Sequence, residues 1–159
     1  MQAHGVTGLA RRGAAVSAAL AGACALAAGA GAAGYPNACT VLTKAHVATA
    51  LFPTSTVTAA PGKETTYPDG VSCTQTVGSL TVTLGLVSQN YGFGGILHPR
   101  VSALKGVGGG AIITGTTAAG KPVATARFRR GPIWVTLSVP GASPSSLQTL
   151  SRSIYAALP

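Results

Sequence analysis

Strict alternation of apolar and polar side chains between residues 80 and 86 is the feature that most limits how this chain can fold. The apolar positions are Leu80, Val82, Leu84 and Leu86, and Thr81, Thr83 and Gly85 lie between them. Successive side chains of a β-strand point to opposite faces, so the pattern predicts a strand with one buried and one solvated face. A turn at Gly78-Ser79 joins it to a preceding strand through Cys73, and residues 111–114 have the composition of another short strand.

A β-hairpin is expected between residues 123 and 138. With a turn at Arg130-Gly131, Phe128 lies opposite Ile133, and the apolar residues at alternate positions of both strands share one face. The same register places Arg127 opposite Trp134 on the other face as a cross-strand cation–π pair. A slip of one residue would expose the apolar set, so we expect this register to be well determined.

Two helices are expected, one at each end of the folded region. After Cys39, a helix capped by Thr40 or Thr43 and ended by Pro53 would bury one apolar stripe, made of Val41, Ala45, Ala48 and Phe52. Ser143 caps the second helix, with Pro144 at its first position. The stripe of this helix consists of Leu147, Leu150, Ile154 and Leu158.

The order of these elements predicts an α+β domain, an antiparallel sheet with N-terminal and C-terminal helices packed on one face. The opposite face would present Thr, Ser, Arg and Trp side chains to solvent. Residues 53–70 are expected to form a surface loop, because they are rich in Thr, Pro and Gly. Residues 91–110 are expected to be mostly loop, with a short helical turn at 101–105.

The first 30 residues have the pattern of a secretory signal peptide. Arg11 and Arg12 close a polar start, and the chain from Gly13 to Gly34 is uncharged and built mostly of Ala and Gly. Cleavage after Ala30, or after Ala32, fits the small-residue rule. An uncleaved membrane anchor is the alternative, although Ala and Gly contribute little to transfer into a bilayer.

Cleavage there leaves residues 31–38 as a short linker and 39–159 as a single exported domain. Lipidation of Cys24 is a further alternative, because residues 20–24 loosely resemble a bacterial lipobox. We therefore expect a secreted protein, with a lipoprotein on the outer side of the cell membrane as the alternative. A membrane tether is expected only if Cys24 is lipidated.

Two cysteines remain in the exported domain, Cys39 and Cys73. In an exported chain an even pair predicts a disulfide. A metal-binding or reactive thiol pair is the alternative, but neither His46 nor His98 stands at a ligand spacing from a cysteine. We expect one structural disulfide, no metal site and no cofactor.

Few residues of the domain suit catalysis. Its only carboxylates, Glu64 and Asp69, lie in one polar segment, which disfavours the paired-acid chemistry of glycosidases. A Ser-His-Asp triad could be drawn from Asp69, either histidine and a serine, but no G-x-S-x-G motif occurs. Residues 106–111 fit G-x-G-x-x-A without the βαβ unit that dinucleotide binding needs. No catalytic residue is assigned.

Positive charge is the strongest indication of a partner. The chain has 11 Lys and Arg against 2 acids, for a net charge of +9, and removal of the leader with its two arginines leaves +7. The candidate ligand surface lies in the hairpin and consists of Arg127, Arg129, Arg130 and Trp134. It suits an anionic wall polymer, a lipid headgroup or an acidic protein surface.

The alternative is that these charges keep an open sheet soluble and block edge pairing. Nucleic acid is not an expected partner, because the lysines are scattered and no aromatic platforms follow a groove.

Several short segments within residues 37–158 resemble a known type of domain. They are Asn37 to Leu51, Cys73-Thr74, the run from Gly106 to Ala111, and the hairpin with its final helix. Together they are similar to small secreted and lipid-anchored actinobacterial domains of unknown function, which are related in style to extracellular sensor domains of mycobacterial receptor kinases. The resemblance implies an exported α+β domain with a disulfide between a helix and a strand, and it implies no reaction.

The sequence thus predicts an exported, non-enzymatic domain that binds or senses an anionic component of the cell envelope. Two alternatives from other classes stay open. One is a secreted hydrolase that uses Ser and His, and the other is a structural accessory protein of an envelope complex.

Overall fold

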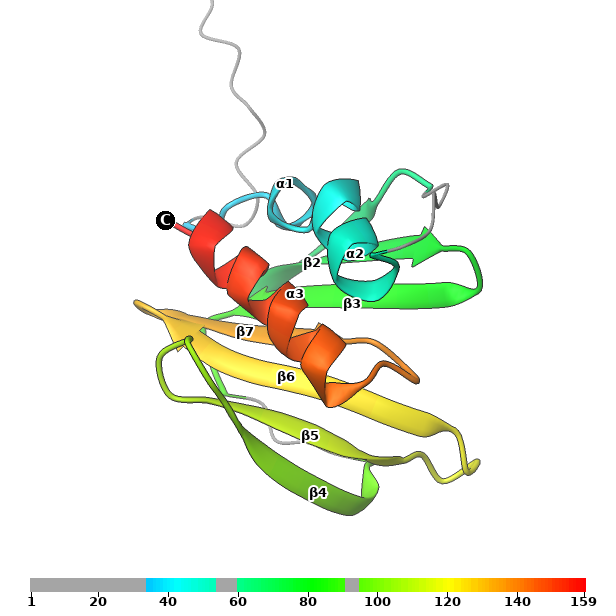
Figure 1. Cartoon of the computed structure of the whole chain (residues 1–159). Coiled ribbons are helices and arrows are strands. Elements are labelled where there is room, and N and C mark those ends of the chain that lie inside the picture. The colour runs from blue at the N-terminus through cyan, green and yellow to red at the C-terminus, as the bar shows by residue number, and fades with distance from the viewer. Residues whose placement is uncertain (1–33, 54–59, 91–94) are drawn as a thin grey trace, which may run out of the picture.

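The structure is a computed structural model that describes residues 34–53, 60–90 and 95–159 (Figure 1). The predicted signal peptide 1–30 and the alternative lipidation site Cys24 lie outside these residues. The described elements are α1 (Ala38–Val41), α2 (Lys44–Leu51), β1 (Lys63–Tyr67), β2 (Gly70–Val77), β3 (Leu80–Val87), β4 (Leu97–Leu104), β5 (Gly110–Thr116), β6 (Pro122–Arg130), β7 (Ile133–Ser138) and α3 (Pro144–Ala157).

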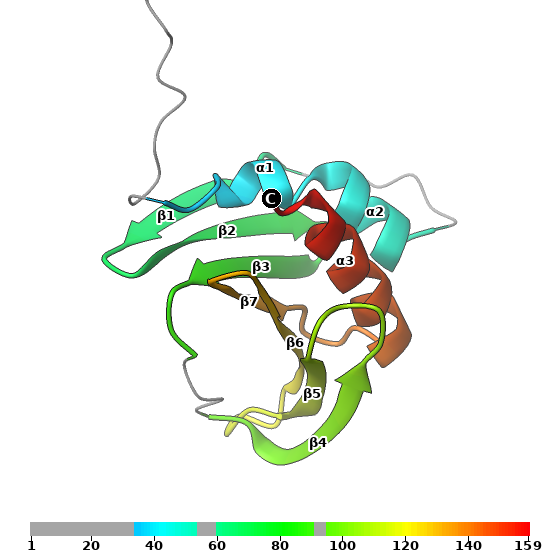
Figure 2. The same cartoon turned by 90° about the vertical axis from the view of Figure 1, so that its left-hand side faces the viewer.

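The strands form one antiparallel sheet in the order β1-β2-β3-β7-β6-β5-β4. The helices all lie on one face of it (Figure 1). The predicted α+β class, with N-terminal and C-terminal helices on one face of an antiparallel sheet, is confirmed. Figure 2 shows that the sheet curves away from the helices, from β3 through β7, β6 and β5 to β4. We call the concave face, which points away from the helices, the inner face.

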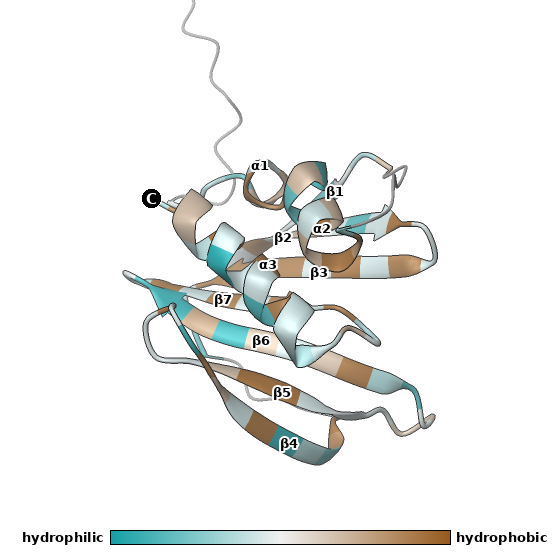
Figure 3. Ribbon diagram, in the orientation of Figure 1, coloured by the Kyte–Doolittle hydropathy of each residue, from teal (hydrophilic) through white to brown (hydrophobic). Residues whose placement is uncertain are grey.

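The hydrophobic core lies between the other face of the sheet and the helices. Val82, Leu84 and Leu86 of β3 are fully buried, as their alternation predicts, and Figure 3 shows the resulting bands of hydropathy along the strand. The stripe predicted for α3 is buried on the sheet, and Ser143 caps the helix by accepting a hydrogen bond from the Ser146 amide. Each buried Leu or Ile stabilises the fold by about 1.5 to 3 kcal/mol.

The N-terminal helix differs from the expectation. The chain forms two helices instead of one, because Asn37 caps α1 and Thr43 caps α2, with a break at Leu42 between them. The buried residues are Ala38, Val41, Leu42, Val47 and Ala50. Of the predicted stripe, Val41 is buried and Phe52 packs against the core. Ala45 is exposed and Ala48 only half-buried, since Val47 and Ala50 form the buried side of α2 after the break. Within the described residues, no helix combines the length and apolar character needed to cross a membrane.

Both edge strands fall in segments that were expected to be irregular. Lys63–Tyr67 forms β1, which pairs with β2 through a tight turn at Pro68-Asp69. Leu97–Leu104 forms β4 in place of the expected loop and helical turn. Neither strand buries one of its faces, so neither shows the apolar alternation that reveals a strand in sequence.

The register of the C-terminal hairpin is shifted by two residues from the predicted one. Arg130 pairs with Ile133, so the turn is Gly131-Pro132, and Phe128 lies opposite Val135 instead of Ile133. Gly131 has φ +56°, a value that glycine adopts without strain at the first position of a two-residue turn. Because the shift is an even number of residues, every side chain keeps its predicted face.

Candidate functional site

The inner face is built from cross-strand rows of small, hydroxyl and basic side chains. The central row crosses four neighbouring strands. It consists of Arg127 of β6, Thr136 of β7, Gly85 of β3 and Ser72 of β2, each paired with the next. The row beside it begins with the apolar Val101 of β4 and Ile113 of β5. It continues with Thr125, Ser138, Thr83, Thr74 and Lys63. Residues in one row share a face because paired positions of antiparallel strands project together.

Arg127 is the most unusual residue on this face. The sequence predicts that it is open to solvent, yet it retains only 7% of its accessible surface, and the adjacent Thr125 retains 5%. Among the described residues, the helices all lie on the other face of the sheet (Figure 2). Burial lowers the pKa of the Arg127 guanidinium, because removal from water disfavours the charged form.

Arg129 and Trp134 form the end row of the inner face. They are cross-strand partners, and the Arg129 guanidinium carbon lies 5.9 Å from the centre of the Trp134 ring. The Nε of Arg129 also donates a hydrogen bond of 2.7 Å to the Gly131 carbonyl. The predicted cation–π pair therefore exists, but its cation is Arg129, and the predicted pairing of Arg127 with Trp134 is wrong.

Arg130 does not belong to this site. It projects to the helix face, where its guanidinium carbon lies 4.5 Å from the centre of the Tyr155 ring and its Nε donates to the Pro159 carbonyl at 3.3 Å. These contacts tie the end of α3 to the hairpin. Of the predicted ligand surface, the structure brings Arg127, Arg129 and Trp134 to one face and removes Arg130 from it.

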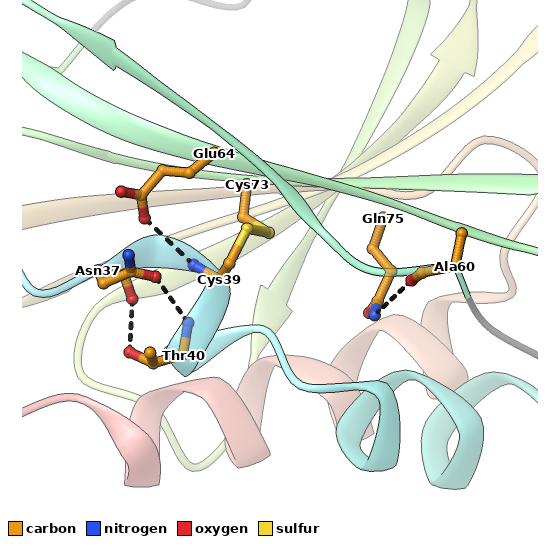
Figure 4. Close-up of a disulfide and its surroundings, with 7 residues drawn as sticks. All are labelled: Asn37, Cys39, Thr40, Ala60, Glu64, Cys73 and Gln75. Carbon is orange, nitrogen blue, oxygen red and sulfur yellow. Dashed lines mark hydrogen bonds between the residues drawn. A yellow bond between two sulfur atoms is a disulfide. The ribbon is translucent and has the colours of Figure 1, made fainter.

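Neither carboxylate of the described strands and turns shares the inner face. Glu64 projects to the helix side, where its Oε2 accepts a hydrogen bond of 3.5 Å from the Cys39 amide (Figure 4). Asp69 lies in the turn between β1 and β2. The inner face thus combines Arg127, Arg129 and Lys63 with hydroxyl groups and no acid, which is the composition that an anion prefers.

The disulfide between Cys39 and Cys73 is confirmed, with an S–S distance of 2.06 Å. It ties α1 to the centre of β2 and lies beside the hydrogen bonds that hold Asn37 to Thr40 (Figure 4). The backbone at Gly62 crosses close to it, since a Cβ there would lie 2.7 Å from the Cys73 sulfur. The disulfide is on the helix side, so it supports the sheet without contributing to the inner face.

The residues considered for catalysis lie on separate elements. His46 is in the first turn of α2, where its Nδ1 donates to the Val41 carbonyl at 2.9 Å. His98 is exposed in β4, at an irregularity of the strand with φ +50°. Among the described residues, neither histidine has a hydrogen bond to a serine or a carboxylate, and no group of three His, Cys, Asp or Glu side chains could hold a metal ion.

The glycine run has a structural role in the turn from β4 to β5. The Lys105 carbonyl accepts hydrogen bonds from Arg152 Nε at 2.9 Å and Gln148 Nε2 at 3.4 Å. Gly106, with φ +83°, lets the Arg152 side chain pass over the turn. This run joins two antiparallel strands, which is not the strand-to-helix context of a dinucleotide site.

Sequence reasoning missed Gly85 as part of the site. The alternation along β3 placed it on the polar face, but only the pairing of β3 with β7 brings it into the row of Arg127. No family model, curated protein or solved structure matches this chain.

Proposed function

We propose that this protein is an exported, non-enzymatic domain that binds a phosphate- or carboxylate-bearing polymer of the cell envelope on its inner face. The composition of the inner face is the observation that carries the proposal. Arg127, Arg129 and Lys63 share this face with hydroxyl side chains, whereas Glu64 and Asp69 lie elsewhere, and a face with several cations and no acid attracts an anionic ligand.

The neighbours of Arg127 support the same ligand class. Arg129 is a second cation at the end of the face, and its guanidinium lies over the Trp134 ring. Thr136 adds a hydroxyl group in the row of Arg127, and Ser138 adds one in the next row. Charged hydrogen bonds to a phosphate or carboxylate would be strengthened in such a partly desolvated setting.

The curvature of the face favours a polymer over a bilayer. A concave sheet surrounds a narrow chain but touches a flat membrane only at its rims (Figure 2). A lipid headgroup offers the same phosphate group. The experiment must therefore distinguish binding to a polymer from binding to a lipid.

The disulfide is typical of an oxidising compartment, which agrees with export through the predicted leader. The intact mass of the protein recovered from its host tests this part of the proposal. Loss of residues 1–30 without added mass would support secretion. An acyl chain on Cys24 would indicate a lipoprotein instead, and recovery of the full-length chain with both domain cysteines reduced would contradict export.

Binding is tested by cosedimentation with purified cell walls, before and after removal of their anionic polymer, and with phosphatidylglycerol vesicles. Arg127→Met and Arg129→Ala should each weaken binding to intact walls about tenfold, the equivalent of one lost charged hydrogen bond. Lys44→Ala is the matched control, because it removes the same charge from the exposed surface of α2. Added salt should weaken the binding of the unmodified protein.

The proposal fails if stripped and intact walls retain the protein equally, or if Lys44→Ala weakens binding as much as Arg127→Met. Retention of the protein by vesicles but not by walls would contradict a polymer ligand and identify the ligand as a lipid headgroup. Turnover that is lost with substitution of His46 or His98 would contradict the non-enzymatic part and favour the hydrolase.

A further inference from the structure

The outer edge of β4 is the most exposed strand surface among the described residues. β4 is the last strand of the sheet, and its side chains are exposed at every position but Leu104. Val101 retains 68% of its accessible surface and Leu97 retains 47%. An edge strand has a row of unpaired backbone N–H and C=O groups, which another extended chain can pair with.

Half of this edge is protected and half is open. Pro99 and the register shift between Leu97 and Arg100 disrupt the first part of the strand, as bulges and prolines do on protected edges. From Arg100 to Leu104 the pairing with β5 is regular, and this segment has a single charged residue. Five regular residues are enough for one more strand to pair.

The opposite edge of the sheet differs in both respects. β1 has Lys63 and Glu64 in its five residues, and Glu64 is engaged with the Cys39 amide. The disulfide and α1 also hold this edge, through contacts of α1 with β1 and β2. Charge and covering elements therefore protect β1, and within the described part of the chain β4 is the more accessible edge.

Charge on the domain is divided between these two edges. Both acids of the described residues, Glu64 and Asp69, belong to the β1–β2 hairpin. The half of the sheet that ends in β4 has only basic charges on its strands and turns, namely Arg100, Lys105, Lys121, Arg127, Arg129 and Arg130. An acidic strand is attracted to this half, whereas a second copy of the domain would bring two basic edges together.

We propose that β4 binds an extended acidic segment of a partner protein by strand addition along Arg100–Leu104. Backbone hydrogen bonds would supply affinity. Val101 would contact an apolar side chain on one face of the incoming strand, and Arg100 would pair with its acids on the other face. The backbone hydrogen bonds of this interaction form along the outer edge of the sheet, two strands from β6, although Val101 shares the inner-face row of Ile113 and Thr125.

The test uses the isotopically labelled chain with its disulfide intact and a short synthetic peptide of alternating Glu and Val. NMR titration should shift the amides of residues 100–104 and slow their exchange with solvent. Val101→Glu should weaken binding about tenfold, because it places an acid against the acidic strand. Tyr67→Glu is the matched control at the opposite edge, where Tyr67 is 47% exposed, and it should leave binding unchanged.

A second peptide with Pro at alternate positions keeps the acids but cannot form the ladder, and it should not bind. Equal binding of the two peptides would overturn the proposal, since charge alone would then explain it. Shifts at Arg127, Arg129 and Trp134 without any change at residues 100–104 would also overturn it. Concentration-dependent shifts of β4 without peptide would assign the edge to a second copy of the chain instead.

Discussion

The Arg129 guanidinium lies 5.9 Å from the centre of the Trp134 ring, directly across the hairpin from it. A hydrogen bond from Arg129 Nε to the Gly131 carbonyl fixes the same side chain to the turn. Part of the guanidinium is thereby oriented before any ligand arrives, which lowers the entropic cost of binding an anion.

A double-mutant cycle between Arg129→Ala and Trp134→Leu should give a coupling free energy of about 0.5 to 1 kcal/mol, the value of an exposed cation–π pair. Unfolding by denaturant is the measurement. The cycle between Arg127→Met and Trp134→Leu is the control and should give a smaller coupling, because Arg127 lies opposite Thr136.

Stronger coupling of Trp134 to Arg127 than to Arg129 would support a register with the turn at Arg130-Gly131 and contradict the observed one. The chain contains one tryptophan, so its fluorescence reports on this site alone. Arg129→Ala should change that emission, whereas Arg130→Ala, on the other face, should leave it nearly unchanged.

The hairpin shows which part of the fold the sequence determines. Alternation fixes the face of each side chain, and Phe128, Val135 and Leu137 are buried as predicted. It does not fix the pairing itself, because a shift of two residues leaves every face unchanged. The position of the turn determines which arginine pairs with Trp134. A turn at Arg130-Gly131 would pair Arg127 with it, and the observed turn at Gly131-Pro132 pairs Arg129 with it.

Two other features depend on long-range structure. β1 and β4 lack a buried face, so their sequences show no apolar alternation. Their strand conformation depends on backbone pairing with β2 and β5. The burial of Arg127 is also a tertiary property, because alternation predicts only which face a side chain is on and not how much of it is covered. The disulfide could be predicted, because an exported chain with two cysteines in its domain has only one pairing.

Gly85→Val should block the inner face without unfolding the protein. A Cβ at Gly85 would meet no described atom closer than the Thr136 carbonyl oxygen at 3.9 Å, so the larger side chain fits above the row of Arg127. Valine suits a strand better than glycine, so the free energy of unfolding should stay equal or rise by up to about 1 kcal/mol. Binding to intact walls should fall about tenfold.

Ala45→Val adds the same kind of bulk on the exposed surface of α2 and should leave wall binding unchanged. Undiminished binding of a folded Gly85→Val protein would place the ligand away from the central row of the inner face.

Reduction of the Cys39–Cys73 disulfide should lower the free energy of unfolding by about 3 to 4 kcal/mol in the chain-entropy model. The bond closes a loop with a sequence separation of 34 residues and anchors α1 to the sheet. Denaturant unfolding with and without reductant measures the difference. The Cys39→Ala/Cys73→Ala protein should match the reduced form and should not respond to reductant, and an unchanged midpoint on reduction would contradict a stabilising role.

Ser151→Ala should stabilise the fold. Ser151 is fully buried in α3, and its Oγ has no hydrogen-bond partner in the described structure. Removal of a buried, unsatisfied hydroxyl recovers its desolvation cost, and alanine also has the higher helix propensity, for a combined gain of about 1 to 2 kcal/mol.

Ser153→Ala separates these two contributions. Ser153 is half-buried in the same helix, and its Oγ donates to the Thr149 carbonyl at 3.3 Å. Its substitution gains helix propensity but loses a hydrogen bond, so the net change should be within about 0.5 kcal/mol of zero. If thermal and denaturant unfolding show Ser151→Ala to be no more stable than Ser153→Ala, the Ser151 hydroxyl must have a partner, such as a buried water, that offsets its desolvation.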